Sequence, residues 1–495
     1  MMAHSQARDS TARMPSGIPY IIANEAAERF CFYGMRTILV IFMTRYLLDR
    51  HGRSAPMDQS EAMVYYHLFI FGVYFIPLFG SIIADAFLGK YRTIILLSIA
   101  YSVGCLALTL DQTRVGLLVG LSLIAIGSGG IKPCVSANVG DQFGPHNQHL
   151  LSKAFGWFYV AINFGSMFST FLTPFLLEGH SDAIKAFLAE RPNWWQTLRT
   201  LDPNIMLAFL EQRFCPSLTD MHGPGLAFGV PALAMILATG VFWMGRRRFV
   251  HVPPAGLALV RQTFSLAGLR QVGRVLPIFA LMIPFNCLYD QSGSAWVLQA
   301  ERMDRRFLGV EWFSSQVQVV NPILVLIFVP LFTYILYPAI NRVFCLTDLR
   351  KIGLGLFLTA ISFVIPAHVE ALIAAGGQPN ISWQFLAYVL LTAAEVLINV
   401  TCLEFAYTQA PAGSKSLVTA LYLMSIALGN ISTSVVNLVL DLLQQKAGLS
   451  LTGVYYYWLF VALMLVTAVV FIPVARSYRP IQLGVQGQGS CRCDD

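Results

Sequence analysis

Three charged side chains lie together inside the first long apolar segment of the chain. Glu25, Glu28 and Arg29 occur within an apolar stretch that runs from about 18 to 48. Their spacing of i, i+3 and i+4 places all three on one face of a helix. A charge at the centre of a bilayer costs about 2.5–3.5 kcal/mol on insertion scales, so these groups must pair or face an aqueous cavity. Carboxylates held there can carry protons in competition with the arginine, whereas the simpler alternative is an ion-paired packing contact between helices.

Further polar residues fall inside this segment and the other apolar segments. They are Arg36, His67, Lys132, Asn163, Arg274, Asn321, Glu395 and Glu404. Each alone has a structural explanation: a buried histidine is often a satisfied core residue, and Asn321 before Pro322 can bond a carbonyl that the proline frees. Taken together, two cations, Arg36 and Lys132, come from the first half of the chain and an anion, Glu395, comes from the second. Such a cavity suits a zwitterion whose two charged ends are held apart.

The composition excludes a soluble protein. Of the 495 residues, 56% are hydrophobic and 12% are charged, with a mean hydropathy of +0.62. A soluble domain normally carries about twice that charge. The net charge of +7 does not indicate a nucleic-acid partner, because basic residues such as Arg246, Arg247 and Arg248 lie in predicted loops, as the positive-inside rule describes. The nine cysteines form no disulfide framework. No metal-ligand cluster and no nucleophile with a base appear at workable spacing, so we expect no catalytic site, no metal site and no enzyme.

Hydropathy predicts an all-α membrane protein with twelve spanning helices. The predicted spans are 18–48, 61–88, 91–110, 115–140, 153–178, 225–246, 272–299, 314–341, 351–371, 383–409, 415–443 and 452–475. An even number of spans places both termini on one side. The loops on that side carry most of the basic residues, so we expect both termini in the cytoplasm.

The basic connection 249–271 divides the predicted helices into two sets of six. We therefore expect a six-helix bundle at 18–248, a cytoplasmic linker at 249–271 and a second six-helix bundle at 272–476. Six plus six without a large soluble domain is typical of a secondary transporter with two pseudo-symmetric halves. Outside the bundles we expect a polar N-terminal tail at 1–17 and a disordered C-terminal tail at 477–495. An insertion at about 179–224 is expected at the extracytoplasmic membrane interface.

Several motifs along the chain carry a family resemblance. The first is Glu-Ala-Ala-Glu-Arg-Phe at 25–30, followed by Tyr-Gly-Met-Arg at 33–36. Others are the stretches 80–93, 127–143, 155–166, 289–296 and 395–411. In this order, and over nearly the whole chain, they resemble the proton-coupled oligopeptide transporters, a branch of the major facilitator superfamily. The resemblance implies the fold of that superfamily, with twelve transmembrane helices in two six-helix bundles.

The resemblance also implies roles for individual residues. Proton coupling would involve Glu25, Glu28, Arg29, His67, Lys132 and Glu395. Substrate binding would involve Tyr33, Arg36, Tyr74, Lys132, Tyr159, Asn163, Asn286, Tyr289, Asn321 and Glu395. Arg36 and Lys132 would face the peptide carboxylate, while Glu395 with two asparagines would hold the amino group. Lys132 and Glu395 would pair across the halves when the site is empty.

Four positions depart from the family pattern. Phe32 stands where the family often has a tyrosine, while Tyr422 and Asn286 each stand where many members have a tryptophan. Thr333 stands where an aspartate is expected to pair with Arg274. These changes affect selectivity rather than fold.

We therefore predict a symporter in the cell (inner or plasma) membrane that imports di- and tripeptides with protons as the coupling ion and no other cofactor. The functional unit is expected to be a monomer in membrane lipid, with no nucleic-acid partner. The nearest alternative is a transporter of the same fold that carries another small anion or metabolite, such as nitrate. A transport-inactive sensor is a further alternative, and the intact charged residues argue against it.

Overall fold

The computed structural model of the chain describes residues 13–144, 146–178, 223–254, 256, 266–402, 405, 415–447 and 453–478. The predicted insertion at 179–224 lies almost entirely outside the described residues, as do Glu404, most of the two tails and the central part of the linker. Most described residues are helical. The described strands are a short antiparallel hairpin, β1 (Arg306–Phe307) and β2 (Val310–Glu311).

The first half consists of six spans. The first is α1 (Ile18–Ile41), continued by the π-helical turn η1 (Phe42–Tyr46). The second is α2 (Gln59–Phe75), α3 (Pro77–Ile83) and η2 (Ala84–Leu88) in one line. The remaining spans are α4 (Lys90–Leu110), α5 (Arg114–Asp141), α6 (Leu151–Glu178) and α9 (Gly223–Met244).

The second half also consists of six spans. It begins with α11 (Leu266–Tyr289), the turn η6 (Asp290–Gly293) and α12 (Ala295–Ala300). The next span contains η7 (Gln316–Val319), α13 (Val320–Leu331), η8 (Phe332–Leu336) and α14 (Tyr337–Asn341). Then follow α15 (Asp348–Ala374), α16 (Ser382–Glu395) with η9 (Val396–Val400), α18 (Lys415–Ala447) and α19 (Val454–Ser477).

These helices follow the predicted spans with small shifts at their ends. Ten of them are long and apolar enough to cross a membrane. The other two, α1 and α11, are 24 residues long but carry charged side chains within the apolar sequence. Local sequence fixes several starts: Asp58 and Thr113 each accept hydrogen bonds from backbone N–H groups in the first turn that follows. The largest shift is at α11, which begins at Leu266 rather than at the predicted 272.

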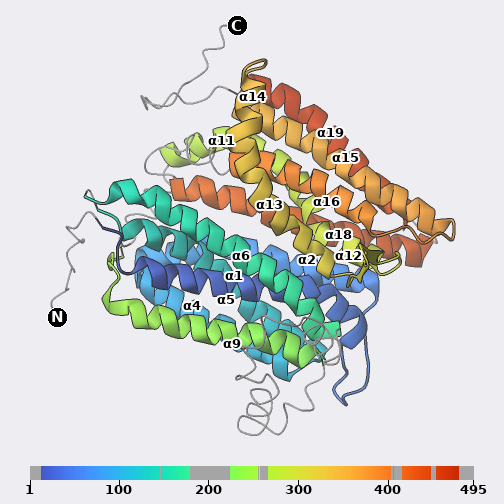
Figure 1. Cartoon of the computed structure of the whole chain (residues 1–495), viewed down its shortest axis with the longest axis horizontal. Coiled ribbons are helices and arrows are strands. Elements are labelled where there is room, and N and C mark those ends of the chain that lie inside the picture. Colours follow the sequence, from blue (N-terminus) through green and yellow to red (C-terminus); the bar gives the residue numbers. More distant parts are fainter. Residues whose placement is uncertain are drawn as a thin grey trace.

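The twelve spans form two six-helix bundles, shown in Figure 1 as a blue-to-green bundle and a yellow-to-red one. In the first, α1 packs against α6 and α9, and α4 packs against α5 and α9. In the second, α15 packs against α16 and α19, and α11 packs against α18. Close approach within the first bundle depends on glycine: a Cβ added to Gly80 would lie 2.6 Å from the Cα of Gly130.

Each bundle has its own apolar core, and the two bundles meet along two pairs of helices. Helix α2 lies along α18, and α6 lies along α13. The first core includes Val297 and Leu298 of α12, while Trp296 of the same helix belongs to the second core, so α12 packs against both halves. We call the end of the molecule that contains α12 and the β1–β2 hairpin the α12 end.

Loops at the α12 end are tied together by polar contacts. The Asn380 side chain donates to a carboxylate oxygen of Asp304 at 3.1 Å and to the backbone carbonyl of Arg306 at 2.7 Å. The backbone N–H of Arg306 and the side chain of Asn380 together hold the pKa of the half-buried Asp304 carboxyl below its usual range. The hairpin is thereby fixed to the start of α16.

Candidate functional site

The charged triad of α1 is paired within its own helix. Arg29 Nε lies 2.9 Å from Glu25 Oε1, and Arg29 Nη2 lies 2.5 Å from Glu28 Oε2. The second oxygen of Glu28 accepts from the Ser128 hydroxyl of α5 at 2.8 Å. All three charged side chains are buried, as the sequence requires of charges at this depth. The arginine therefore holds both carboxylates at the first-half wall, where a proton on either one would weaken an ion pair.

Lys132 of α5 has a different environment from the one expected. Its Nζ is buried without a hydrogen-bond partner, at 4.2 Å from the centre of the Phe32 ring and 4.3 Å from that of Tyr74. The expected ion pair between Lys132 and Glu395 is therefore not formed in this structure. The physical reason is that the amine lies between two aromatic rings of its own half, while Glu395 has partners in the second half.

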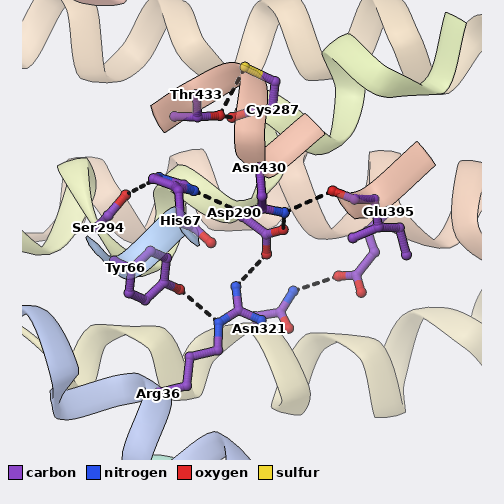
Figure 2. Close-up of polar contacts among 12 residues, drawn as sticks. Arg36, Tyr66, His67, Cys287, Asp290, Ser294, Asn321, Glu395, Asn430 and Thr433 are labelled. Atoms are coloured by element: carbon purple, nitrogen blue, oxygen red, sulfur yellow. Dashed lines mark hydrogen bonds and ion pairs between the residues drawn. The ribbon is translucent and has the colours of Figure 1, made fainter. Parts of the chain in front are cut away.

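Arg36 joins the two halves instead of standing free for a substrate. Its guanidinium donates to the Tyr66 hydroxyl at 2.7 Å and forms an ion pair with Asp290 of η6. Figure 2 shows Arg36 reaching from the first half to this carboxylate. Tyr66 is packed tightly against the same turn, since a Cβ added to Gly293 would lie 2.0 Å from its hydroxyl oxygen.

His67 completes this interface network from α2. Its Nδ1 lies 2.8 Å from the side-chain oxygen of Asn430, and its Nε2 lies 2.9 Å from the Ser294 hydroxyl. The amide nitrogen of Asn430 donates to Asp290 at 2.6 Å, which orients the amide oxygen toward the imidazole. Because that oxygen can only accept, the network assigns the proton of a neutral His67 to Nδ1, and Nε2 then accepts from Ser294. A second proton on the ring would require the serine hydroxyl to turn.

Glu395 ends α16 and faces the first half. Its Oε2 accepts from the Asn321 amide at 2.6 Å, and Asn321 also donates to the Thr392 hydroxyl at 3.1 Å. The Tyr289 side chain is a further hydrogen-bond neighbour of the carboxylate. Asn321 and Glu395, which were both expected to hold a peptide amino group, are therefore in direct contact.

Tyrosines predicted to line the site gather around the same carboxylate. The Glu395 carboxylate is close enough to interact electrostatically with the hydroxyl groups of Tyr33 of α1 and Tyr159 of α6. Tyr74 neighbours Tyr33, which links this group to the rings that hold Lys132. The structure therefore brings together an unpaired ammonium, a carboxylate and several phenol groups from both halves.

Three other predicted positions have local contacts. Asn163 donates to the backbone carbonyl of Tyr159 at 2.9 Å, within its own helix. Asn286 is buried and donates to the Met282 carbonyl at 2.9 Å, close to Ser425 of α18. Arg274 is exposed, as is Thr333, where the family pattern has its expected acidic partner.

The polar and ring contacts between described residues of the two halves lie toward the α12 end. Besides the Arg36 and His67 contacts, they include Arg45 with Glu301, Gln318 with the Thr37 carbonyl, Ser434 with the Val64 carbonyl, and Phe175 with Phe313. Lys132 and Glu395 are placed farther toward the opposite end of their helices. The structure is therefore closed at the α12 end.

Sequence reasoning missed Asp290, Asn430, Ser294 and Tyr66 as members of this network. Asp290 had a usable signal, because it is an acidic residue in an apolar span and stands within one of the family-like motifs. Asn430 had no comparable signal, because nothing in the sequence pattern of α18 connects it to His67, 363 positions away.

Comparison with known proteins gives a consistent result. The family model described as the POT family matches residues 91–269 and 261–455. Peptide transporter family 1 of Drosophila melanogaster is 37% identical over 396 residues, which cover 72% of this chain and 48% of that protein. Human solute carrier family 15 member 2 is 33% identical over 435 residues, which cover 78% of this chain and 53% of that protein. The chain thus spans about half the length of the curated relatives it matches.

Solved structures match over nearly their full length. One is described as an auto-inhibited POT family peptide transporter, with a TM-score of 0.77, 32% identity and coverage of 96% of this chain and 99% of that one. Another, the POT family transporter PepTSo, has a TM-score of 0.76, 33% identity and coverage of 94% and 99%.

Proposed function

Because the chain belongs to the POT family, we propose that it is a proton-coupled symporter that imports di- and tripeptides by alternating access. It is a multi-pass membrane protein with the major facilitator superfamily fold, twelve transmembrane helices in two six-helix bundles. The observation that carries the proposal is the pair of opposite charges that the two halves present. Among the residues that the structure describes, Lys132 Nζ has no hydrogen-bond partner, and the Glu395 carboxylate accepts from the Asn321 amide rather than from a cation.

A zwitterionic peptide fits between these two charges. Its carboxylate would bind the Lys132 ammonium, and its amino group would bind Glu395 together with the Asn321 side-chain oxygen. Charge-assisted hydrogen bonds of this kind contribute about 1.5–3 kcal/mol each. The surrounding tyrosines add hydroxyl groups and apolar walls without net charge.

Proton coupling is proposed to use two groups of residues. The first is the Glu25–Arg29–Glu28 triad, where protonation of a carboxylate would release the arginine. The second is His67, whose bonds to Asn430 and Ser294 join the halves. A proton that loosens these bonds favours opening of the α12 end, and peptide and proton then bias the same conformational equilibrium.

The proposed orientation places the α12 end outside the cell and both termini in the cytoplasm. The basic residues Lys90, Arg246 and Lys351 support it, because all belong to the end opposite α12. With the α12 end closed, this structure corresponds to a carrier that opens toward the cytoplasm. We propose the cell membrane as its location, a monomer as its working unit and no enzymatic activity or cofactor.

The deciding experiment is uptake of a labelled dipeptide into proteoliposomes that contain the purified chain. We expect accumulation with an inwardly directed proton gradient and only equilibration without one. If the carrier transported another anion, such as nitrate, that ion would compete with the dipeptide or replace it. Accumulation of dipeptide that does not depend on the proton gradient would contradict proton coupling. An absence of dipeptide uptake would contradict the substrate class.

A further inference from the structure

The ring of Phe32 contacts two cations at once. It is fully buried on α1, with the Lys132 amine 4.2 Å from its centre and the Arg29 guanidinium carbon 5.9 Å away. Its own orientation is fixed by neighbouring rings: Tyr33 packs against it edge-on at 5.3 Å, and Phe69 lies at 6.3 Å. The ring is therefore held in place rather than free to turn away.

The two cations differ in what else they contact. Arg29 is neutralised by two carboxylates of its own helix. Lys132 has no hydrogen-bond acceptor for its amine, and the rings of Phe32 and Tyr74 lie at nearly equal distances from it. A desolvated ammonium gains from the negative face of an aromatic ring, and this attraction is largest where water is excluded.

We propose that Phe32 is a positioning residue for substrate recognition, which together with Tyr74 holds the Lys132 ammonium by cation–π contact and out of hydrogen-bond contact with the carboxylates of both halves. An ammonium held by ring faces remains available to a peptide carboxylate, whereas one paired with a glutamate would first have to be released. The inference rests on the proposed function. It explains why the tyrosine that the family pattern often has at this position can be a phenylalanine here: the contact uses the ring face and needs no hydroxyl.

The first test changes the ring's electrostatics and keeps its shape. Phe32 is replaced by mono-, di- and trifluorinated phenylalanine, and competition by a dipeptide and by its C-terminal amide is measured in purified carrier. Fluorination weakens the negative face of the ring in steps. We expect the preference for the free acid to fall stepwise, by about tenfold over the series, with little change in binding of the amide. The same series at Phe69, whose ring lies beside Phe32 and contacts no cation among the described residues, is the matched control.

The second test does not depend on peptide binding. Carbodiimide cross-linking of purified carrier, followed by mass spectrometry, reports whether Lys132 meets Glu25, Glu28 or Glu395. We expect no cross-link in wild type, a cross-link in Phe32→Leu, and none in Phe32→Tyr, which retains the ring face.

The outcomes separate this inference from the proposed function. A cross-link already present in wild type, or absent from Phe32→Leu, would overturn the role of the ring whatever the carrier transports. A preference for the acid that stays flat along the Phe32 series, or falls equally along the Phe69 series, would overturn it as well. Failure of wild type to bind either peptide, with the expected cross-links present, would count against the substrate class alone.

Discussion

Arg36 of the first half and Asp290 of the second half form a buried ion pair, and the same aspartate accepts from Asn430, the partner of His67. One carboxylate therefore connects an arginine on α1 with an imidazole on α2 through a residue of α18. Removing one partner from a buried ion pair costs about 3–5 kcal/mol, because it leaves an uncompensated charge. This network is thus well suited to hold the α12 end closed.

Breaking this ion pair should open the α12 end. We expect Asp290→Asn to shift the population of carriers toward separation of the halves there, since Arg36 loses its counter-charge. Spin labels at the ends of α2 and α12 would report the separation by pulsed EPR. The matched control is Glu370→Gln, because Glu370 pairs with Arg302 at the same end but within the second half. An unchanged distance distribution in Asp290→Asn would show that the pair does not hold this end.

His67 should be needed more for proton coupling than for peptide binding. We expect His67→Phe to bind dipeptide with affinity within a few-fold of wild type but to lose accumulation driven by a proton gradient. Phenylalanine fills the space but cannot take a proton or bond to Asn430 and Ser294. Binding is measured in detergent and uptake in proteoliposomes. Ser434→Ala, which removes another contact between the halves, serves as control and should retain gradient-driven uptake. Full coupling in His67→Phe would remove this residue from the proton route.

The α1 carboxylates should separate net transport from exchange. Glu25→Gln and Glu28→Gln are each expected to abolish gradient-driven uptake yet permit peptide exchange between loaded and external pools, since exchange needs no net proton movement. Ser128→Ala removes only one hydrogen bond to Glu28, worth about 1.5–3 kcal/mol for a charged acceptor. We expect it to shift the pH dependence of uptake without abolishing it. Concentrative uptake by both glutamine variants would disprove this role.

Glu395 should recognise the amino end of the peptide. In Glu395→Gln we expect competition by a free dipeptide to weaken by at least tenfold, while competition by its N-acetylated form stays as in wild type. The discrimination between the two would then disappear. Thr392→Ala is the control, because it removes the other acceptor of Asn321 and leaves the carboxylate in place. If Glu395→Gln rejects the acetylated peptide as strongly as wild type does, the amino group is bound elsewhere.

Local sequence patterns predicted those parts of the site that depend on a single helix. The spacing of Glu25, Glu28 and Arg29 was enough to place them on one face, and hydropathy was enough to locate the helices. Contacts between the halves could not be predicted in the same way. Arg36 and Asp290 lie 254 positions apart, and no periodicity relates α1 to η6.

The wrong expectation about Lys132 has a related cause. Charge alone favoured its pairing with Glu395, but the pairing depends on which end of the carrier is closed. With the α12 end closed, two rings of the first half contact the amine and the asparagine of α13 contacts the carboxylate. Sequence specifies the residues that can meet across the halves, and the conformation selects which of them do.

The contact between Gly293 and Tyr66 makes this end of the carrier sensitive to a single methyl group. In Gly293→Ala the new carbon would displace the Tyr66 phenol and remove one of the two acceptors of Arg36 when the end closes. The added methyl group would destabilise only the closed state, because residue 293 and Tyr66 separate when the α12 end opens. Gly293→Ala therefore offers a way to hold the carrier open at the α12 end without changing any charge. EPR distances across the α12 end would show whether this variant stays open.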